Sequence, residues 1–181
     1  AFATKDGFKL SADKNPNRAG VQAVLGEVDE GELVRKGIES GQVELVVICD
    51  SQPGGASWSE GLVEALKGEV KAIVISLEDT WLTQTKQVAF PGLHAIEKDG
   101  TFVNQNGRLQ RVRAAVSAPG DARGELDVLQ ELGRAGGHYP RVLSAGGVFR
   151  RLAAASPDKF EGLTYRGLGA VGLPLVGAAD Q

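Results

Sequence analysis

Apolar positions in the middle of the chain form two short, nearly continuous runs with a helix-spaced segment between them. The runs are "VELVVIC" (43–49) and "VKAIVISL" (70–77), and continuous aliphatic stretches of this length are typical of strands buried on both faces, with helices above and below. Between them, Leu62 and Leu66 lie on one face at helical spacing, and Gly68 is well placed to end the helix. Strand, helix and strand so close together predict a parallel unit with a right-handed crossover.

The connection after the first strand, "DSQPGGASW", contains a Pro-Gly-Gly turn at 53–55, and "SWSE" (57–60) matches a capping box that starts the helix. A dinucleotide-binding loop requires G-x-G-x-x-G spacing, which this connection lacks, and Asp50 at the strand end would repel a phosphate. A tight strand-to-helix turn is therefore favoured over a nucleotide site.

Upstream, Leu33, Val34 and Ile38 have the spacing of a short amphipathic helix that Gly41 ends. The preceding stretch, "LSADKNPNRAGVQAVLG" (10–26), is rich in turn formers and is interpreted as a loop. The pattern indicates the α/β class, as an edge fragment of a parallel strand-helix-strand layer, a Rossmann-like segment, and not a whole doubly wound domain.

The stretch "EKDGTFVNQNGRLQR" (97–111) combines two turn dipeptides with a short strand-forming run. Asp99–Gly100 and Asn106–Gly107 favour turns because glycine takes positive φ freely, so we predict a hairpin from Thr101 to Val112. A hairpin alone does not require the hydrogen-bonding side chains concentrated here, which are Thr101, Asn104, Asn106, Arg108 and Gln110.

Other candidate chemistry is sparse. Arg111 and Arg113 share a strand face with Leu109, which indicates an exposed edge more than an anion site. His94 and His138 lack metal-ligand spacing and are interpreted as structural. The adjacent carboxylates at 78 and 79 are explained by a solvated loop at least as well as by acid-base chemistry. We assign no catalytic residue and no metal ligand.

Composition narrows the alternatives further. A net charge of -3 over 181 residues favours neither nucleic acid nor an anionic membrane as partner. The only cysteine, Cys49, cannot form an internal disulfide or hold an iron-sulfur cluster, and it fits a reducing compartment. No secretory signal is found at the start of the chain. The chain has no methionine and does not begin with one, so we expect either processing or excision from a longer gene product. Its apolar runs are too short to span a bilayer.

The C-terminal part of the chain, residues 125–181, differs in composition from residues 1–124. Residues 1–124 form the expected α/β segment, and residues 125–181 are rich in glycine and alanine, with "VLQELGRAGG" and "SAGGVFRRLAAASP" reading as short helices. The first of these helices is expected to start near Glu125. We expect a tail of short helices and loops.

The hairpin stretch resembles a late segment of molybdopterin-dependent oxidoreductases. The resemblance lies in eight residues at fixed spacing, which are Pro91, Glu97, Gly100, Thr101, Asn104, Gly107, Arg108 and Gln110. In the strand before them, Gln87 stands where that family has an aspartate. Catalytic molybdenum enzymes of the family place a further β-barrel domain after this motif, and the 70 residues after Arg111 do not resemble one.

Within the superfamily, "NPNRAGVQAVLG", "LVRKGIESGQVELVVICD", "APGDARGELDVLQELG" and "FEGLTYRGLGAVGLPL" are similar to the large iron-sulfur subunit of bacterial NADH-quinone oxidoreductase. The resemblance implies a structural C-terminal module without independent catalysis, placed peripherally on the cytoplasmic side of the inner membrane. Its implied partners are other respiratory subunits or upstream domains, which would hold the iron-sulfur clusters.

Two alternatives remain open. In the first, the chain is part of an active molybdopterin-dependent oxidoreductase of the formate dehydrogenase kind, whose pterin Thr101, Asn104, Arg108 and Gln110 would contact. This alternative predicts that these side chains converge on a cavity. In the second, the strand-helix-strand unit binds a nucleotide or small molecule, which the missing glycine fingerprint disfavours.

Overall fold

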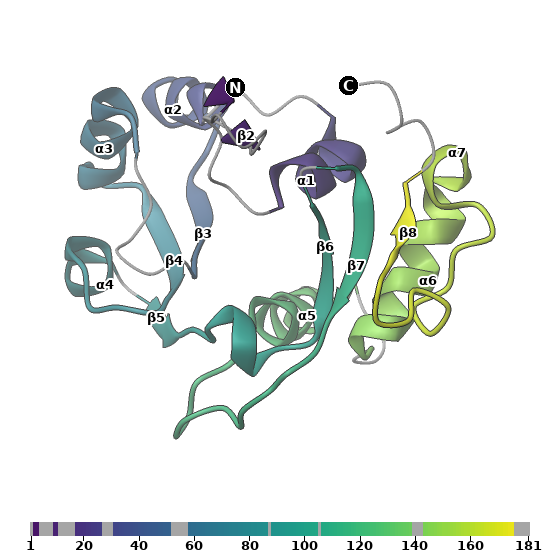
Figure 1. The fold of residues 1–181 in the computed structure, drawn as a ribbon. Helices are drawn as coiled ribbons and strands as arrows, with labels where there is room; N and C mark the ends of the chain where they lie inside the picture. The colour runs from purple at the N-terminus through teal and green to yellow at the C-terminus, as the bar shows by residue number, and fades with distance from the viewer. Residues whose placement is uncertain are drawn as a thin grey trace.

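The structure, a computed structural model, describes residues 2–3, 9–10, 17–26, 31–51, 58–86, 88–104, 106–138 and 143–175 (Figure 1). The strands are β1 (Phe2–Ala3), β2 (Lys9–Leu10), β3 (Leu45–Asp50), β4 (Lys71–Ser76), β5 (Val88–Pro91), β6 (Gly100–Val103), β7 (Arg108–Val112) and β8 (Leu173–Pro174). The helices are α1 (Arg18–Leu25), α2 (Glu32–Glu39), α3 (Glu60–Lys67), α4 (Trp81–Thr85), α5 (Glu125–Ala135), α6 (Ala145–Ala155) and α7 (Pro157–Phe160), with a 3-10 turn η1 (Ala95–Glu97). These elements confirm the α/β class.

The first core lies under the parallel sheet β3-β4-β5. The helices α3 and α4 connect its strands in sequence, and Figure 1 shows both on the side of the sheet away from β6 and β7. The helix α2 packs against α3. The apolar side chains between helices and sheet are mainly aliphatic: Ile48, Leu62, Leu66, Val70, Ala72, Val74 and Leu82. The predicted parallel strand-helix-strand unit is confirmed.

The prediction that the first strand is buried on both faces is wrong. Along β3, Ile48 and Asp50 are each 4% exposed, whereas Leu45 and Val47 are 53% and 39% exposed. The strand is an edge strand of the described sheet, and its connecting helices cover one face only. Buried and exposed residues therefore alternate along β3, because successive side chains of a strand point to opposite faces of the sheet.

Helix ends in this half follow local capping chemistry. The helix α3 begins at Glu60, where Ser59 Oγ accepts a hydrogen bond from the Leu62 N–H at 3.3 Å. The predicted capping box therefore starts the helix too early; Ser57 and the turn at 53–55 lie outside the described residues. The predicted stop after the preceding helix is confirmed, since Gly41 takes φ +71 and donates to the Ile38 carbonyl.

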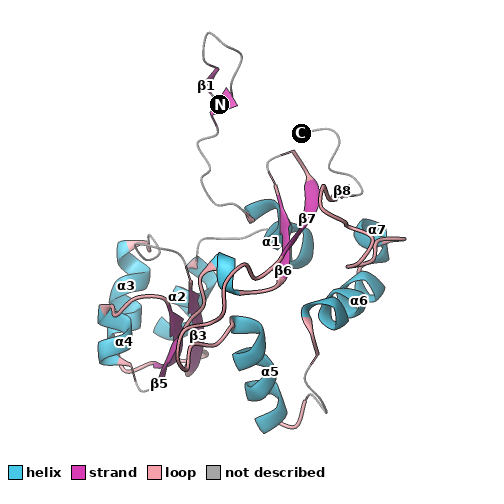
Figure 2. Cartoon of the chain, turned by 60° about the horizontal axis from the view of Figure 1, so that its bottom comes forward, coloured by secondary structure: helices cyan, strands magenta, loops and turns pink. Residues whose placement is uncertain are grey.

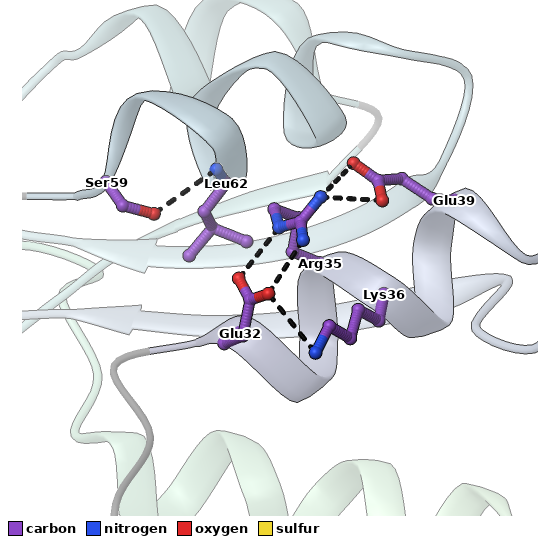
Figure 3. A network of polar contacts seen from close by, with 6 residues as sticks. All are labelled: Glu32, Arg35, Lys36, Glu39, Ser59 and Leu62. Atoms are coloured by element: carbon purple, nitrogen blue, oxygen red, sulfur yellow. Dashed lines mark hydrogen bonds and ion pairs between the residues drawn. The ribbon is translucent and has the colours of Figure 1, made fainter.

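A network of ion pairs lies along α2, beside α3 (Figure 3). Arg35 Nη2 lies 2.7 Å from Glu32 Oε1, and its Nη1 binds both carboxylate oxygens of Glu39 one turn later. The hydrogen bonds from Arg35 to Glu32 are the main cause that holds the pKa of Glu32 at about 2, although desolvation opposes the shift. Arg35 also lies close to Gly61, where the helices α2 and α3 meet.

The stretch interpreted as a loop before α2 contains α1, so that prediction is wrong from Arg18 onward. The helix lies against β6, and Asn17 at its start accepts a hydrogen bond from the Val103 N–H at 2.9 Å. At the other end, Lys159 Nζ donates to the Ala23 carbonyl at 2.8 Å. Both bonds come from residues more than 80 positions away, which explains why local pattern did not predict the helix.

The second core lies under the antiparallel sheet β6-β7-β8. The predicted hairpin is confirmed, with Thr101 opposite Arg111 and Gly107 at φ 69 in the turn. The predicted turn at Asp99–Gly100 is wrong, because Gly100 is the first residue of β6 and does not take positive φ. The tail supplies β8, whose Leu173 pairs with Leu109.

Helices of the tail cover this sheet. The predicted helices are present as α5 and α6, and α7 follows α6 after one residue. Phe149 and Phe160 form an edge-to-face pair with ring centres 6.0 Å apart. The buried residues of this core are Val103, Leu109, Phe149, Phe160, Leu168 and Leu175. The hairpin and the tail thus share a core across position 124, and the division predicted there stays a prediction.

The prediction that Arg111 lies on an exposed edge is wrong. The strand β7 is the middle strand of its sheet, and the Arg111 guanidinium lies 4.4 Å from the centre of the Tyr165 ring. A cation above an aromatic face is attracted by the ring quadrupole. The tail thus supplies both β8, which pairs with Arg108 and Leu109, and the tyrosine that packs on Arg111. Figure 2 shows the two groups of elements with α5 between them.

Candidate functional site

The side chain of Asn104 organises the hairpin turn. Its Oδ1 accepts hydrogen bonds from the N–H groups of Asn106 at 2.9 Å and Arg108 at 3.0 Å. Its Nδ2 donates to Gln110 Oε1 at 3.1 Å. An asparagine that binds backbone two residues ahead is a common way to close a turn. Asn104 thus uses both ends of its amide within the hairpin.

Arg108 and Gln110 fasten the tail to the hairpin. Arg108 Nη2 donates to the Gly172 carbonyl at 2.7 Å, and Gln110 Nε2 donates to the Val171 carbonyl at 3.5 Å. The close approach requires a glycine at 172, because a Cβ there would meet the Leu109 carbonyl oxygen and lie 2.7 Å from Gln110 Cγ. The buried Nε of Arg108 has no acceptor among the described residues. These contacts start the pairing of β7 with β8.

Thr101 lies apart from the other three. It contributes to a cavity of about 440 Å³ between the 3-10 turn, β6 and the starts of α5 and α6. The residues lining it include Leu93, Lys98, Phe102, Glu125 and Ser144. The structure therefore brings Asn104, Arg108 and Gln110 together and places Thr101 at a separate cavity.

An ion pair forms one wall of this cavity. Lys98 Nζ lies 2.7 Å from Glu125 Oε1, and the two side chains are 23% and 20% exposed. Burial opposes ionisation of Glu125, but the Lys98 ammonium outweighs it and holds the pKa of the carboxyl below its usual value. Glu125 is therefore ionised at neutral pH and is unsuited to act as a general acid there. No spacing in the sequence linked these two residues.

A second polar group lies at the carboxyl ends of the parallel strands, where open α/β sheets bind ligands. Asp50 is 4% exposed and Ser76 is 5% exposed. The Gly92 N–H donates to the Ser76 carbonyl at 2.7 Å, which brings the end of β5 close. Burial, together with the Glu125 charge and despite Lys98, raises the pKa of the nearby Cys49 thiol, so it is a poor nucleophile at neutral pH.

The other residues weighed as candidate groups have structural contacts. His94 Nδ1 accepts from the Ile96 N–H at 3.4 Å and caps the 3-10 turn, as its structural interpretation predicted. Asp79 accepts a hydrogen bond from Thr83 Oγ1 at 2.6 Å near the start of α4, which lowers the pKa of Asp79. Within the described ranges, no group of three His, Cys, Asp or Glu side chains is placed to hold a metal ion. No helix in those ranges is long and apolar enough to cross a membrane.

In this structure the side chains of the hairpin residues do not converge on a common cavity that could hold a pterin. Asn104 and Gln110 bond each other, and Arg108 bonds the tail backbone, so contact with a pterin would require these bonds to be exchanged. Thr101 is the only one of the four that lines the 440 Å³ cavity. Their cofactor role stays a prediction.

With the fold and these contacts established, the chain belongs to the molybdopterin oxidoreductase family. The family pattern matches residues 17–135, which is more than half of the chain and includes the parallel sheet, the hairpin and α5.

Among its curated relatives, the chain is similar to the F420-dependent formate dehydrogenase 1 subunit alpha of Methanococcus maripaludis, with 35% identity over 138 residues. That match covers 73% of this chain and 20% of the relative. The NADPH-Fe(3+) oxidoreductase subunit alpha of Geobacter sulfurreducens is 31% identical over 71% of this chain and 12% of its own length.

The formate dehydrogenase subunit alpha of Methanocaldococcus jannaschii, also F420-dependent, is 30% identical over 178 residues, or 91% of this chain and 24% of the relative. The chain thus spans about a quarter or less of the length of each of these three relatives.

Proposed function

We propose that the chain is a structural module of a longer oxidoreductase subunit and catalyses no reaction on its own. One observation carries the proposal: the polar side chains of the hairpin motif bind the protein itself. Asn104 closes the turn, and Arg108 and Gln110 hold the tail at 171–172. Residues that serve a cofactor usually keep donors directed at a cavity.

In its finer form, the proposal places the module at the C-terminal end of the large iron-sulfur subunit of a bacterial NADH-quinone oxidoreductase. This placement is supported by the sequence resemblance over α1, over the segment from α2 through β3, at the start of α5 and in the tail. The clusters would then lie in upstream domains, and the module would contact those domains or neighbouring subunits. It would be peripheral on the cytoplasmic side of the inner membrane.

One experiment distinguishes a module of a longer polypeptide from a free 181-residue protein. Peptides of this chain are followed by mass spectrometry through native fractionation of the source cells. We expect them to travel with a longer polypeptide that contains cluster-binding cysteines, and the purified 181-residue chain to bind no stoichiometric molybdenum or iron. A free 18.9 kDa chain in the cells, or metal on the purified chain, would refute the proposal.

The second candidate is pterin contact within an active molybdopterin enzyme. Two relatives named as formate dehydrogenase subunits, and the buried Arg108 Nε without an acceptor among the described residues, favour it. It predicts that Arg108→Met lowers the molybdenum content of the complete subunit and leaves the folding of this part unchanged.

The structural proposal predicts the reverse for Arg108→Met. Removing the guanidinium leaves the Gly172 carbonyl without its donor, so the free energy of unfolding of the isolated chain falls by about 1–3 kcal/mol. The molybdenum content of the complete subunit, if it has any, stays unchanged. Arg113→Met is the matched control, because Arg113 lies just beyond β7 and is exposed.

A further inference from the structure

Three successive backbone N–H groups in the hairpin turn donate hydrogen bonds to one residue. The N–H groups of Asn106 and Arg108 donate to Asn104 Oδ1, at 2.9 and 3.0 Å. The N–H of Gly107 between them donates to the Asn104 carbonyl at 3.0 Å. The Asn104 N–H in turn donates to the Arg108 carbonyl at 2.9 Å. The peptide groups before, within and after the Asn106–Gly107 pair are therefore all held in place.

An asparagine followed by glycine has a reactivity of its own. Asparagine is a thermolabile residue, because its side-chain Cγ lies within reach of the backbone nitrogen of the next residue. Glycine has no Cβ that would hinder this approach. Asn106 is the only asparagine of the chain that precedes glycine, since Asn15, Asn17 and Asn104 precede proline, arginine and glutamine. Asn106 is exposed, and its carboxamide has no partner among the described residues, so the restraint on this pair comes from the backbone bonds to Asn104.

The reaction requires only water. The Gly107 nitrogen gives up its proton and attacks Asn106 Cγ, a bond forms between the nitrogen and Cγ, and the Cγ–Nδ2 bond breaks as ammonia leaves with that proton. The product is a five-membered succinimide ring. Water opens the ring at one of its two carbonyls, which gives aspartate when the Gly107 nitrogen leaves Cγ and isoaspartate when it leaves the main-chain carbon. In total, one water enters and one ammonia leaves.

We propose that Asn106–Gly107 is a self-modification site that Asn104 guards. In the closed turn the Gly107 N–H donates to the Asn104 carbonyl, so its nitrogen keeps its proton. The neighbouring N–H groups bonded to Asn104 Oδ1 prevent this peptide group from turning toward the side chain. The closed turn therefore suppresses deamidation, and opening of the turn permits it. The inference goes beyond the proposed function, since position 106 is not among the eight residues of the family resemblance.

Formation of isoaspartate makes the opening of the turn permanent. Isoaspartate lengthens the backbone by one carbon atom, so the N–H and carbonyl groups that follow it no longer match their partners. The Gly107 carbonyl accepts a hydrogen bond from the Leu175 N–H at 2.9 Å, and Arg108 Nη2 donates to the Gly172 carbonyl at 2.7 Å. Displacement of the turn breaks both bonds, and the tail loosens where it crosses the hairpin. Deamidation thus converts a transient opening into a lasting change.

The first experiment compares the native chain with the unfolded chain. Both are incubated at mildly alkaline pH, the unfolded one in guanidinium chloride. Deamidation is followed in single peptides by the mass change from amide to acid and by isoaspartyl methyltransferase labelling. We expect deamidation at Asn106 to be about ten-fold or more slower in the native chain, because the backbone hydrogen bonds of the turn have to open first.

The other asparagines, Asn15, Asn17 and Asn104, are internal controls for that experiment and should react far more slowly than Asn106 in the unfolded chain. Equal rates at Asn106 in the native and the unfolded chain overturn the guarding role of the turn. An unfolded chain in which Asn106 reacts no faster than the internal controls overturns the site itself.

The second experiment opens the turn without unfolding the chain. Asn104→Ala removes the Oδ1 acceptor of two N–H groups, so deamidation at Asn106 should become about ten-fold faster in native buffer. Asn104→Asp is the matched control, because it keeps an acceptor oxygen and loses only the bond from Nδ2 to Gln110. Its rate should stay close to that of wild type. Hydrogen-exchange protection in β4 checks that both variants are folded.

Two results of the second experiment overturn the role of Asn104. One is an Asn104→Ala rate equal to that of wild type, and the other is an Asn104→Asp rate as fast as that of Asn104→Ala. The first experiment uses no variant, so it decides whether the turn guards the site even when Asn104→Ala does not fold.

The third experiment tests the consequence for the tail. The isoaspartate form is separated from aged protein and compared with Asn106→Asp, which has the same charge and an unaltered backbone length. We expect hydrogen exchange of the Leu175 N–H to be faster in the isoaspartate form and unchanged in Asn106→Asp. Equal exchange in the isoaspartate form and wild type, or equally fast exchange in the isoaspartate form and Asn106→Asp, overturns the proposed effect of backbone length.

Discussion

The two three-stranded sheets of this chain are built from different ranges of sequence. The parallel sheet and its helices α2, α3 and α4 use residues 32–91, in an order in which each element packs near the one before it. The antiparallel core gathers Val103 and Leu109 from the hairpin with Phe149, Phe160, Leu168 and Leu175 from the tail, and α1 from upstream. The first half is organised locally and the second by contacts between distant segments.

The parallel and antiparallel halves also differ in the kind of contact that stabilises them. The parallel half relies on aliphatic packing, and its described ion pairs on α2 and α3 are exposed. The antiparallel half adds aromatic pairs and charged side chains bonded to backbone across the chain, such as Arg108 to Gly172. A local unit tolerates the loss of one contact more easily than a unit whose strands are brought together by a few long-range contacts. The two halves should therefore respond differently to mutation.

The largest expected effect is at Phe160, which is 2% exposed and packs edge-to-face on Phe149. Phe160→Ala leaves a cavity in the antiparallel core, and the free energy of unfolding falls by about 3–5 kcal/mol. Hydrogen exchange should show lost protection in β6, β7 and β8 and near-normal protection in β4. Leu66→Ala, in the parallel core at 1% exposure, should give the opposite pattern. Uniform loss of protection in both variants would show that the halves fold as one unit.

Next is the crossing of the tail over the hairpin at Gly172. Gly172→Ala combines a positive φ of 80 with a collision between the new Cβ and the Leu109 carbonyl, so it costs about 2–4 kcal/mol. Gly162→Ala is the control, since Gly162 has φ 73 and nothing within 4 Å of an added Cβ, and it should cost about 1 kcal/mol. Urea denaturation of both variants measures the difference. Equal losses would mean that the tail does not approach the hairpin as described.

A smaller loss of stability is expected at the ion pair between Lys98, which lies just before β6, and Glu125, the first residue of α5. Glu125→Gln leaves the partly buried ammonium without its carboxylate and costs about 1–3 kcal/mol at pH 7. Because the folded pKa of Glu125 lies below its usual 4.5, its contribution is present above pH 4.5 and is lost as pH falls through the folded pKa.

The difference between wild type and Glu125→Gln should therefore shrink in urea titrations between pH 5 and pH 2. Glu131→Gln is the control in the same helix, because Glu131 pairs with Arg123 at the surface with both side chains about half exposed. It should have almost no effect at either pH. A difference that stays constant with pH would show that Glu125 contributes by packing and not by charge.

The smallest effect is expected on α2. Arg35→Gln removes two of the three ion pairs drawn in Figure 3 and leaves the Lys36–Glu32 pair. The melting temperature should nevertheless fall by less than about 2 °C at physiological salt, because surface pairs are screened. The clear readout is the carboxyl titration: the pKa of Glu32 should rise from about 2 toward 4.5 in an NMR titration. A Glu32 pKa unchanged in the variant would show that Arg35 does not determine it.

The accuracy of the sequence predictions follows the same division. In the parallel half, the runs at 43–49 and 70–77 and the stripe of Leu62 and Leu66 identified β3, β4 and α3, because periodicity reflects burial within a local unit. Two predictions there were wrong: the capping box placed the start of α3 too early, and β3 was expected to be buried on both faces. Its coverage depends on elements that the local pattern does not contain.

In the antiparallel half, Asn106–Gly107 predicted the hairpin because the turn requires positive φ at Gly107. The strand β8 has only two residues and no pattern of its own, so it is defined by pairing with β7 alone. The helix α1 was missed for a related reason, since Asn17 forms its long-range bond with Val103. The candidate residues Asn104, Arg108 and Gln110 were found by motif, but their contacts could not be.

The sequence by itself determined the α/β class, the parallel unit, the hairpin and the family resemblance, since these depend on residue types at short fixed spacings. The tertiary structure alone decided which sheet face is open, that β7 is a central strand, and that Lys98 meets Glu125 across 27 positions. The physical reason is that burial and ion pairing depend on which distant segments meet, and periodicity within one segment contains no information about its partner.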